Sequence, residues 1–229
     1  VDGAPLPLRI TELMADNNLT VKDGRGQAED WIEIHNPNNG PVNLGGYGLS
    51  DDPLLPMKWV FPATNLAGHA HLLVFASGQA ESIDEGGYLH ANFSLAADGE
   101  SVQLTATDGV TVVDALLNYP AQRTDLAYGR TLAGAATFME PTPGAWNLTT
   151  TYTGWLASLD FSHPRGFYTN AISLVISNPN PGATVWYALN GPTPATAYAG
   201  PLLLGSSVVV RAEVRQAGYK APFIQTRSY

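Results

Sequence analysis

Short runs in which apolar and polar residues alternate recur along the whole chain, with turn residues between them. Examples are LRITEL at 8–13, DWIEIHN at 30–36, SVQLTAT at 101–107 and VVVRAEV at 208–214. Alternation with a period of two is the pattern of a strand that buries one of its faces. No window keeps the i, i+3, i+4, i+7 spacing of an amphipathic helix for three turns. The pattern therefore predicts an all-β protein.

Turn residues divide these runs, and a change of composition divides the chain. The clearest hairpin joins SVQLTAT to VTVVDALL through Asp108 and Gly109, a dipeptide favoured in two-residue turns. From residue 131 to 154 the chain is rich in Thr, Ala, Gly and Pro and has no alternating run. We therefore predict a first β domain at 1–135, a linker at 136–154 that packs in part through Trp146, and a second domain at 155–229. The short strands of the second domain suit a small immunoglobulin-type sandwich.

Charge and composition exclude several classes of function. The formal net charge is −9, and only 11 of the 229 residues are Lys or Arg. These basic residues are spread singly, so we expect no binding of nucleic acid or anionic lipid. The longest apolar runs are far shorter than the roughly 18 residues of a membrane span, so we expect no membrane insertion in this segment. Without cysteine, the chain has neither disulfides nor thiolate metal sites.

The order of motifs over residues 6–130 resembles the lamin tail domain family. These motifs are LRITEL, DWIEIHN, VNLGGYGLSDD, KWVFP, LLVFASG, GESVQLTATDG and AYGR. The resemblance implies an immunoglobulin-like β-sandwich for the first domain. Together with the sandwich expected at 155–229, the chain should contain two immunoglobulin-like β-sandwich domains in tandem. The landmarks KWVFP, YGR and TPGAWN, at 58–62, 128–130 and 142–147, are similar to those of bacterial members that are parts of large exported proteins. An extracellular or cell-surface location, with the signal peptide removed, is therefore implied.

Residues 155–229 resemble the C-terminal immunoglobulin-like module of chitobiases and β-hexosaminidases. The resemblance rests on FSHPRGFYT, GATVWYALNG and VVVRAEVRQAGY. That module is an accessory domain and carries none of the catalytic carboxylates of those enzymes, so no glycosidase activity is implied. In similar bacterial proteins this pair of modules precedes a CotH-type kinase-like domain. A downstream domain of the same polypeptide is therefore an expected partner.

The strand at 30–36 presents a candidate binding surface. Its alternation sends Ile32 and Ile34 to the core and places Trp31, Glu33 and His35 on the outer face. An exposed acid and imidazole beside an indole form a candidate ligand-binding stripe. No nucleophile or third polar group accompanies them, so the alternative is an ordinary polar surface.

Three acids share the parity of core residues at strand ends and form a candidate Ca²⁺ site. They are Glu12, Asp30 and Asp51, and the 16–30 loop would add amide and carbonyl oxygens. The alternatives are that each caps backbone N–H groups or pairs with Arg9 or Arg130, or that a bulge turns it outward. The loop lacks the spacing of known calcium loops. We expect no other cofactor.

Histidines and aromatic residues give weaker signals. His69 and His71 have a spacing that can hold Zn²⁺ from a strand, but no third ligand is near in sequence. The five tryptophans and ten tyrosines fit either a carbohydrate-stacking face or core packing.

The sequence thus predicts no enzyme. We expect a non-catalytic module of an exported bacterial protein that recognises a protein or polysaccharide at the cell surface, or positions a downstream domain. Two alternatives are open. One is a carbohydrate-binding module that uses exposed aromatics. The other is the non-catalytic part of an enzyme whose catalytic domain lies beyond residue 229.

Overall fold

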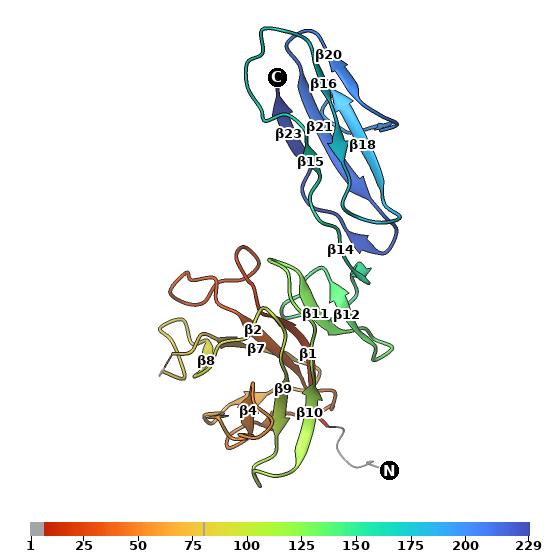
Figure 1. Cartoon of the computed structure of the whole chain (residues 1–229). Helices are drawn as coiled ribbons and strands as arrows, with labels where there is room; N and C mark the ends of the chain where they lie inside the picture. The colour runs from red at the N-terminus through yellow and green to blue at the C-terminus, as the bar shows by residue number, and fades with distance from the viewer. Residues whose placement is uncertain (1–6, 80) are drawn as a thin grey trace. The chain divides into compact units, whose positions relative to one another are not determined.

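The computed structural model describes residues 7–79 and 81–229 (Figure 1). All regular structure in this part of the chain is β, as predicted, so the described residues contain no helix that could span a membrane. The chain divides into two compact units, residues 1–151 and 152–229. The first six residues, with which the predicted first domain begins, lie outside the described residues.

Two sheets enclose the main core of the first unit. The larger has the strand order β13-β12-β11-β1-β2-β7-β8, antiparallel from β12 to β7 with β8 parallel to β7. Its strands are β13 (Thr151–Tyr152), β12 (Ala136–Met139), β11 (Ala127–Arg130), β1 (Arg9–Met14), β2 (Trp31–His35), β7 (His71–Ala76) and β8 (Leu89–Ala91). The smaller has the order β10-β9-β4-β5, with β10 (Val112–Leu116), β9 (Val102–Thr105), β4 (Gly48–Ser50) and β5 (Trp59–Val60). β3 (Val42–Asn43) pairs with β6 (Asn65–Leu66).

A β-bulge in β1 decides which of its residues face the core. Ile10 pairs with Ile34 but Glu12 pairs with Glu33, so Thr11 is the extra residue. As a result Ile10 and Leu13 both enter the core, although they are three residues apart. Glu12 is turned to the opposite face of the sheet, so the prediction that it lies on the core side is wrong. A bulge that turns the acid away from the core was one of the alternatives considered for the candidate Ca²⁺ ligands.

The opposite face of the large sheet is covered as well. Five residues, one from each of five neighbouring strands, lie in one row and form a second apolar cluster. They are Met14, Trp31, Phe75, Ala127 and Met139. Trp31, Glu33 and His35, predicted on an exposed outer face, are at most 2% exposed. The core positions of Ile32 and Ile34 are confirmed. The prediction of the exposed stripe fails because remote segments of the chain cover this face.

The segment predicted as a linker supplies part of that cover. Residues 136–139 form β12, which pairs with β11 along its whole length. The compact first unit continues to Thr151, so most of the 136–154 segment belongs to it. Its Pro and Gly content therefore marks turns within a folded unit.

The predicted hairpin at Asp108 and Gly109 joins β9 to β10, with a longer loop than expected. Ala106 N–H donates to Thr111 O at 2.8 Å, so four residues lie in the reversal. Gly109 has a φ of +72°, which glycine adopts without strain. The Asp108 side chain accepts the Val110 and Thr111 N–H groups and fixes the turn.

The second unit has one four-stranded sheet and three strand pairs around its own core. The sheet order is β19-β18-β21-β23, with β19 (Thr196–Ala197), β18 (Thr184–Leu189), β21 (Val209–Arg215) and β23 (Gln225–Ser228). The pairs are β14 (Gly154–Trp155) with β22 (Tyr219–Lys220), β15 (Asp160–Phe161) with β17 (Ile176–Ser177), and β16 (Ile172–Leu174) with β20 (Leu202–Leu204). Leu174, Val210, Ala212 and Val214 are fully buried at the centre. Asn190, which precedes Gly191, takes the left-handed conformation (φ +56°) that asparagine tolerates in tight turns.

Candidate functional site

Glu12 and Glu33 lie under a segment that the sequence assigned to the linker. Thr142 donates its backbone N–H to Glu12 Oε1 at 3.0 Å and contacts Oε2 through its hydroxyl at 2.9 Å. Gly144 donates its N–H to Glu33 Oε2 at 2.6 Å. Because both carboxyl groups are fully buried, these donors replace the water that the carboxyls lose on folding. The two acids therefore bind a segment of their own chain.

Asn147 fastens this segment to the sheet. Its Nδ2 donates to Thr11 O at 3.0 Å and to Arg130 O at 2.9 Å, and its Oδ1 lies 2.9 Å from Thr142 Oγ1. A Cβ atom on Gly129 would lie 2.4 Å from Thr11 O and 3.1 Å from Asn147 Nδ2. Glycine is thus required at this position for the amide to reach the bulge. The YGR and TPGAWN landmarks meet at this contact.

The Thr142 hydroxyl links Glu12 to Asn147. It lies 2.9 Å from both Glu12 Oε2 and Asn147 Oδ1, so its single hydrogen serves one of these two acceptors at a time. Burial raises the pKa of Glu12 to about 7, against the lowering effect of the Thr142 hydrogen bonds. In the folded chain Glu12 therefore keeps its proton to a much higher pH than a carboxyl group in water does.

Two histidines continue this polar row and are shielded by Trp146. His71 Nδ1 lies 2.9 Å from Glu33 Oε1, and the rings of His35 and His71 are 4.5 Å apart. The indole of Trp146 stands edge-on to His35 at 4.4 Å and is itself 46% exposed. Burial, followed by the neighbouring His71, lowers the pKa of His35. The candidate residues Glu33 and His35 therefore have no open approach for a ligand.

The three candidate Ca²⁺ ligands have separate surroundings. Glu12 belongs to the network above, and Asp51 pairs with Lys58 at 2.6 Å. Asp30 accepts the Asn17 N–H at 3.4 Å, and burial raises its pKa to about 6. Within residues 7–79 and 81–229, no group of three potential metal ligands contains any of them. The His69 and His71 pair is also divided, because His69 contacts Asn39.

The structure brings together three other residues, Asp23, Asp84 and His90, whose ligand atoms all lie within 4.8 Å of one another. Each side chain is at most 1% exposed. None of the three is among the site residues predicted from the sequence. The sequence carries one signal that the two aspartates share. In each of two separate polar stretches, DGRG at 23–26 and DEGG at 84–87, an aspartate stands one or two residues before a glycine. Nothing in the sequence indicated that these stretches meet.

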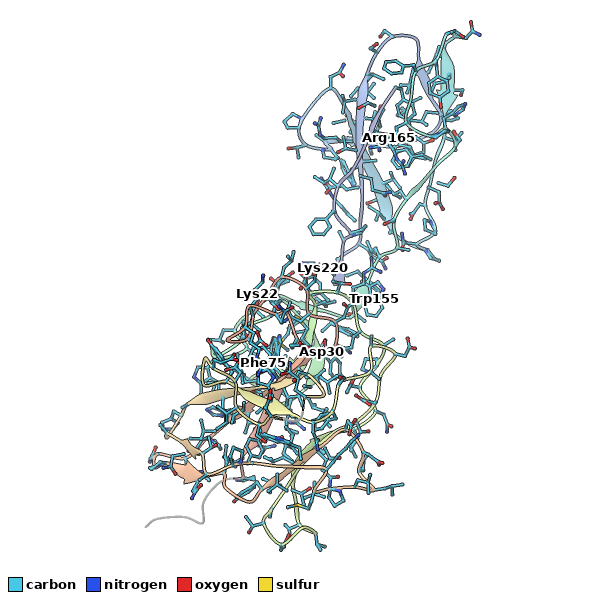
Figure 2. All side chains as sticks on the ribbon, turned by 90° about the vertical axis from the view of Figure 1, so that its left-hand side faces the viewer. Lys22, Asp30, Phe75, Trp155, Arg165 and Lys220 are labelled. Carbon is cyan, nitrogen blue, oxygen red and sulfur yellow. The ribbon has the colours of Figure 1, made fainter. Side chains whose placement is uncertain are left out.

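The second unit carries an open cleft of about 630 Å³ near its C-terminal strand. Arg165, labelled in Figure 2, is the only charged residue that lines it. Phe167 is fully exposed at its side. The complete lining is Arg165, Gly166, Phe167, Asn190, Ser207, Val208, Val209, Ser228 and Tyr229. It offers an aromatic surface and polar contacts, but no carboxylate or imidazole for acid–base chemistry.

The tryptophans do not form an extended exposed platform. Trp31 and Trp59 are core residues, and Trp146 is the one tryptophan in the described chain with a largely exposed side chain. Trp186 is half-buried, and the guanidinium carbon of Arg215 lies 4.8 Å from the centre of the Trp186 ring. The packing interpretation is thus correct for Trp31 and Trp59.

Both units are non-catalytic modules of the immunoglobulin-like all-β class. The chain belongs to the lamin tail domain family, whose model (Lamin Tail Domain) matches residues 3–119. The model for the chitobiase/β-hexosaminidase C-terminal domain matches residues 163–226. Both resemblances noted in the sequence are thereby confirmed. Neither a search of curated proteins nor a search of solved structures finds a match.

Proposed function

We propose that the chain is a non-catalytic recognition part of a larger exported bacterial protein, which binds a protein or polysaccharide at the cell surface. The observation that carries this proposal is the cleft beside Phe167 in the second unit. An aromatic ring that is fully exposed at a cleft offers a stacking surface for a sugar or an apolar side chain. Asn190, Ser207 and Ser228 supply polar contacts at the rim.

The acids of the first unit support recognition over catalysis. Glu12 and Glu33 are each held by donors from residues 142–144, and both are fully buried. Acid–base chemistry requires a carboxyl group within reach of a substrate. The first unit then serves as a rigid support that holds the second unit, or a downstream domain, at the cell surface.

A binding assay with two phenylalanine variants tests the proposal. The chain is applied to an array of bacterial surface polysaccharides and, in parallel, to outer-surface proteins from bacteria with similar domain pairs. Phe167→Ala should weaken the binding at least about tenfold, in the range of an aromatic hot spot. Phe223→Ala is the matched control, because Phe223 is 94% exposed but does not line the cleft. Equal binding by all three proteins, or turnover of a glycan by the chain alone, would contradict the proposal.

A second candidate is an accessory role beside a catalytic domain beyond residue 229. The match of the second unit to a domain named after chitobiases and β-hexosaminidases favours it. A chain extended past residue 229 should then act on its substrate, and removal of residues 1–229 should lower the affinity for an insoluble substrate. Unchanged affinity after the removal would argue against this candidate.

A further inference from the structure

Two loops meet over the edge strand β8 through glycine residues. An ideal Cβ on Gly24 would lie 2.6 Å from Gly86 N, and one on Gly86 would lie 2.7 Å from Gly24 Cα. The backbones therefore approach as closely as only glycine permits. This contact brings Asp23 and Asp84 to the same point, 61 residues apart in sequence. His90 reaches that point from β8, with its ring stacked on Phe75 at a centroid distance of 5.5 Å.

Three of the four carboxylate oxygens have backbone donors. Asp23 Oδ1 accepts the N–H groups of Arg25 and Gln27 at 2.9 and 2.7 Å. Asp84 Oδ1 accepts those of Gly86 and Tyr88, both at 2.9 Å. Asp84 Oδ2 accepts the Gly24 N–H at 2.7 Å. These donors orient both carboxylates and leave one oxygen of each directed at His90.

The fourth oxygen, Asp23 Oδ2, is buried and has no hydrogen-bond partner. It lies 3.9 Å from His90 Nε2, and Asp84 Oδ2 lies 3.1 Å from the same nitrogen. A buried carboxylate oxygen without a donor is costly, so such an atom points to a bound cation or proton. The Arg25 guanidinium does not supply the charge, because it pairs with Glu81 and Glu85.

Two carboxylates and one imidazole thus converge on one buried point, where their ligand atoms lie within 4.8 Å of one another. His90 Nδ1 lies 2.8 Å from Ser77 Oγ, which can accept the Nδ1 hydrogen. In that tautomer the Nε2 lone pair is free to bind a metal ion placed between the imidazole and the two carboxylates. An imidazole whose second nitrogen is held by an oxygen is typical of metal-binding histidines.

We propose that Asp23, Asp84 and His90 bind a divalent transition-metal ion, with Zn²⁺ as the best-fitting probe, through Asp23 Oδ2, Asp84 Oδ2 and His90 Nε2. Two carboxylate oxygens and one imidazole nitrogen are ordinary Zn²⁺ ligands, whereas Ca²⁺ takes six to eight oxygens. The ion neutralises the two carboxylates and ties the 23–27 turn to the 84–88 turn. Its role is structural, since it joins two loops that cover the outer face of the large sheet.

Titration of the metal-stripped chain with Zn²⁺ tests this proposal. After treatment with a chelator and gel filtration, the chain of residues 1–229 should bind one equivalent in calorimetry, and Zn²⁺ should raise its melting temperature. Asp23→Asn removes the charge of the unpartnered oxygen with little change of shape and should weaken binding at least about tenfold. Asp98→Asn, an exposed aspartate in another loop, is the matched control and should bind like the original chain.

A measurement on the unaltered chain covers the case in which a variant unfolds. X-ray absorption of the Zn²⁺-loaded chain should show a first shell of nitrogen and oxygen with one imidazole. Co²⁺ in the same site should give visible absorption that Zn²⁺ displaces. The proposal is overturned if the stripped chain binds neither ion, if Asp23→Asn binds as tightly as the original, or if NMR shows a His90 imidazolium that Zn²⁺ leaves unchanged.

Discussion

Glu12 lies directly opposite Glu33 across β1 and β2, and both carboxyl groups are buried on the same face of the sheet. Two like charges at such a position destabilise the pairing of the strands. Both carboxyl groups have polar partners from the chain itself. Glu12 accepts hydrogen bonds from the N–H and hydroxyl groups of Thr142, while Glu33 accepts them from Thr11 and Gly144 and lies 2.9 Å from His71 Nδ1. Four predictions follow from this relationship and its surroundings.

Glu12→Gln should stabilise the chain at pH 8 and have little effect at pH 4. The pKa of Glu12 is raised from 4.5 to about 7 in the folded chain, chiefly by burial, with Glu33 raising and His71 lowering it. The folded state therefore holds the proton more tightly, and stability from this group is lost as pH rises from about 4.5 to 7. The loss is at most about 3 kcal/mol, and glutamine avoids it because it is uncharged at both pH values. Urea unfolding at both pH values measures it, with Asp98→Asn as control. An equal effect at pH 4 and pH 8 would mean that folding does not shift the pKa of Glu12.

Asn147→Ala should lower the free energy of unfolding of the first unit by about 2 kcal/mol. The substitution leaves the carbonyl groups of Thr11 and Arg130 without their donor. Segment 140–147 should also become a site of limited proteolysis, because its fastening is lost. Asn92→Ala is the control, since Asn92 makes one exposed contact with Lys58 O. Equal stability and equal cleavage of the two variants would show that the amide does not hold the segment.

Gly129→Ala should destabilise the first unit by about 2 kcal/mol through overpacking. The added methyl would lie 2.4 Å from Thr11 O, which is backbone and cannot turn aside. Gly40→Ala is a matched control, because a Cβ at Gly40 meets nothing within 4 Å. Thermal unfolding of both variants decides the matter. A smaller loss at Gly129 than at Gly40 would mean that the bulge shifts freely.

Trp146→Ala should raise the pKa of His35 towards its usual range. Burial is the main cause of the lowered pKa, and the indole provides cover for the ring. The rise should be incomplete because His71 remains beside His35. NMR titration of the imidazole protons measures the shift, and Phe167→Ala, in the other unit, should leave it unchanged. An unaltered midpoint in Trp146→Ala would mean that other groups bury His35.

The strand pattern predicted the class of fold because periodicity is a local property. Ile32 and Ile34 face the core as their alternation requires, and Gly109 takes the positive φ of a turn between two alternating runs. Alternation predicted the wrong face of the sheet for Glu12, because the sequence does not show whether a bulge shifts the register between Ile10 and Glu12.

The candidate site was less predictable, because what covers a sheet face is a non-local property. Glu33 has the local pattern of an exposed residue, and only the return of Gly144, 111 residues later, buries it. Asp23 and His90 are likewise joined by tertiary structure alone. The landmarks of the family resemblance located the covering segment but gave no indication of its purpose.

The pairing of β12 with β11 has a practical consequence for anyone who divides this chain. A fragment that ends at residue 135 would leave β11 as a bare sheet edge, with a row of unpaired N–H and C=O groups. It would also open two carboxyl groups and an apolar row to water. Such an edge invites pairing with another copy, so the short fragment should aggregate, whereas one that ends at residue 152 keeps β12 and β13 beside β11.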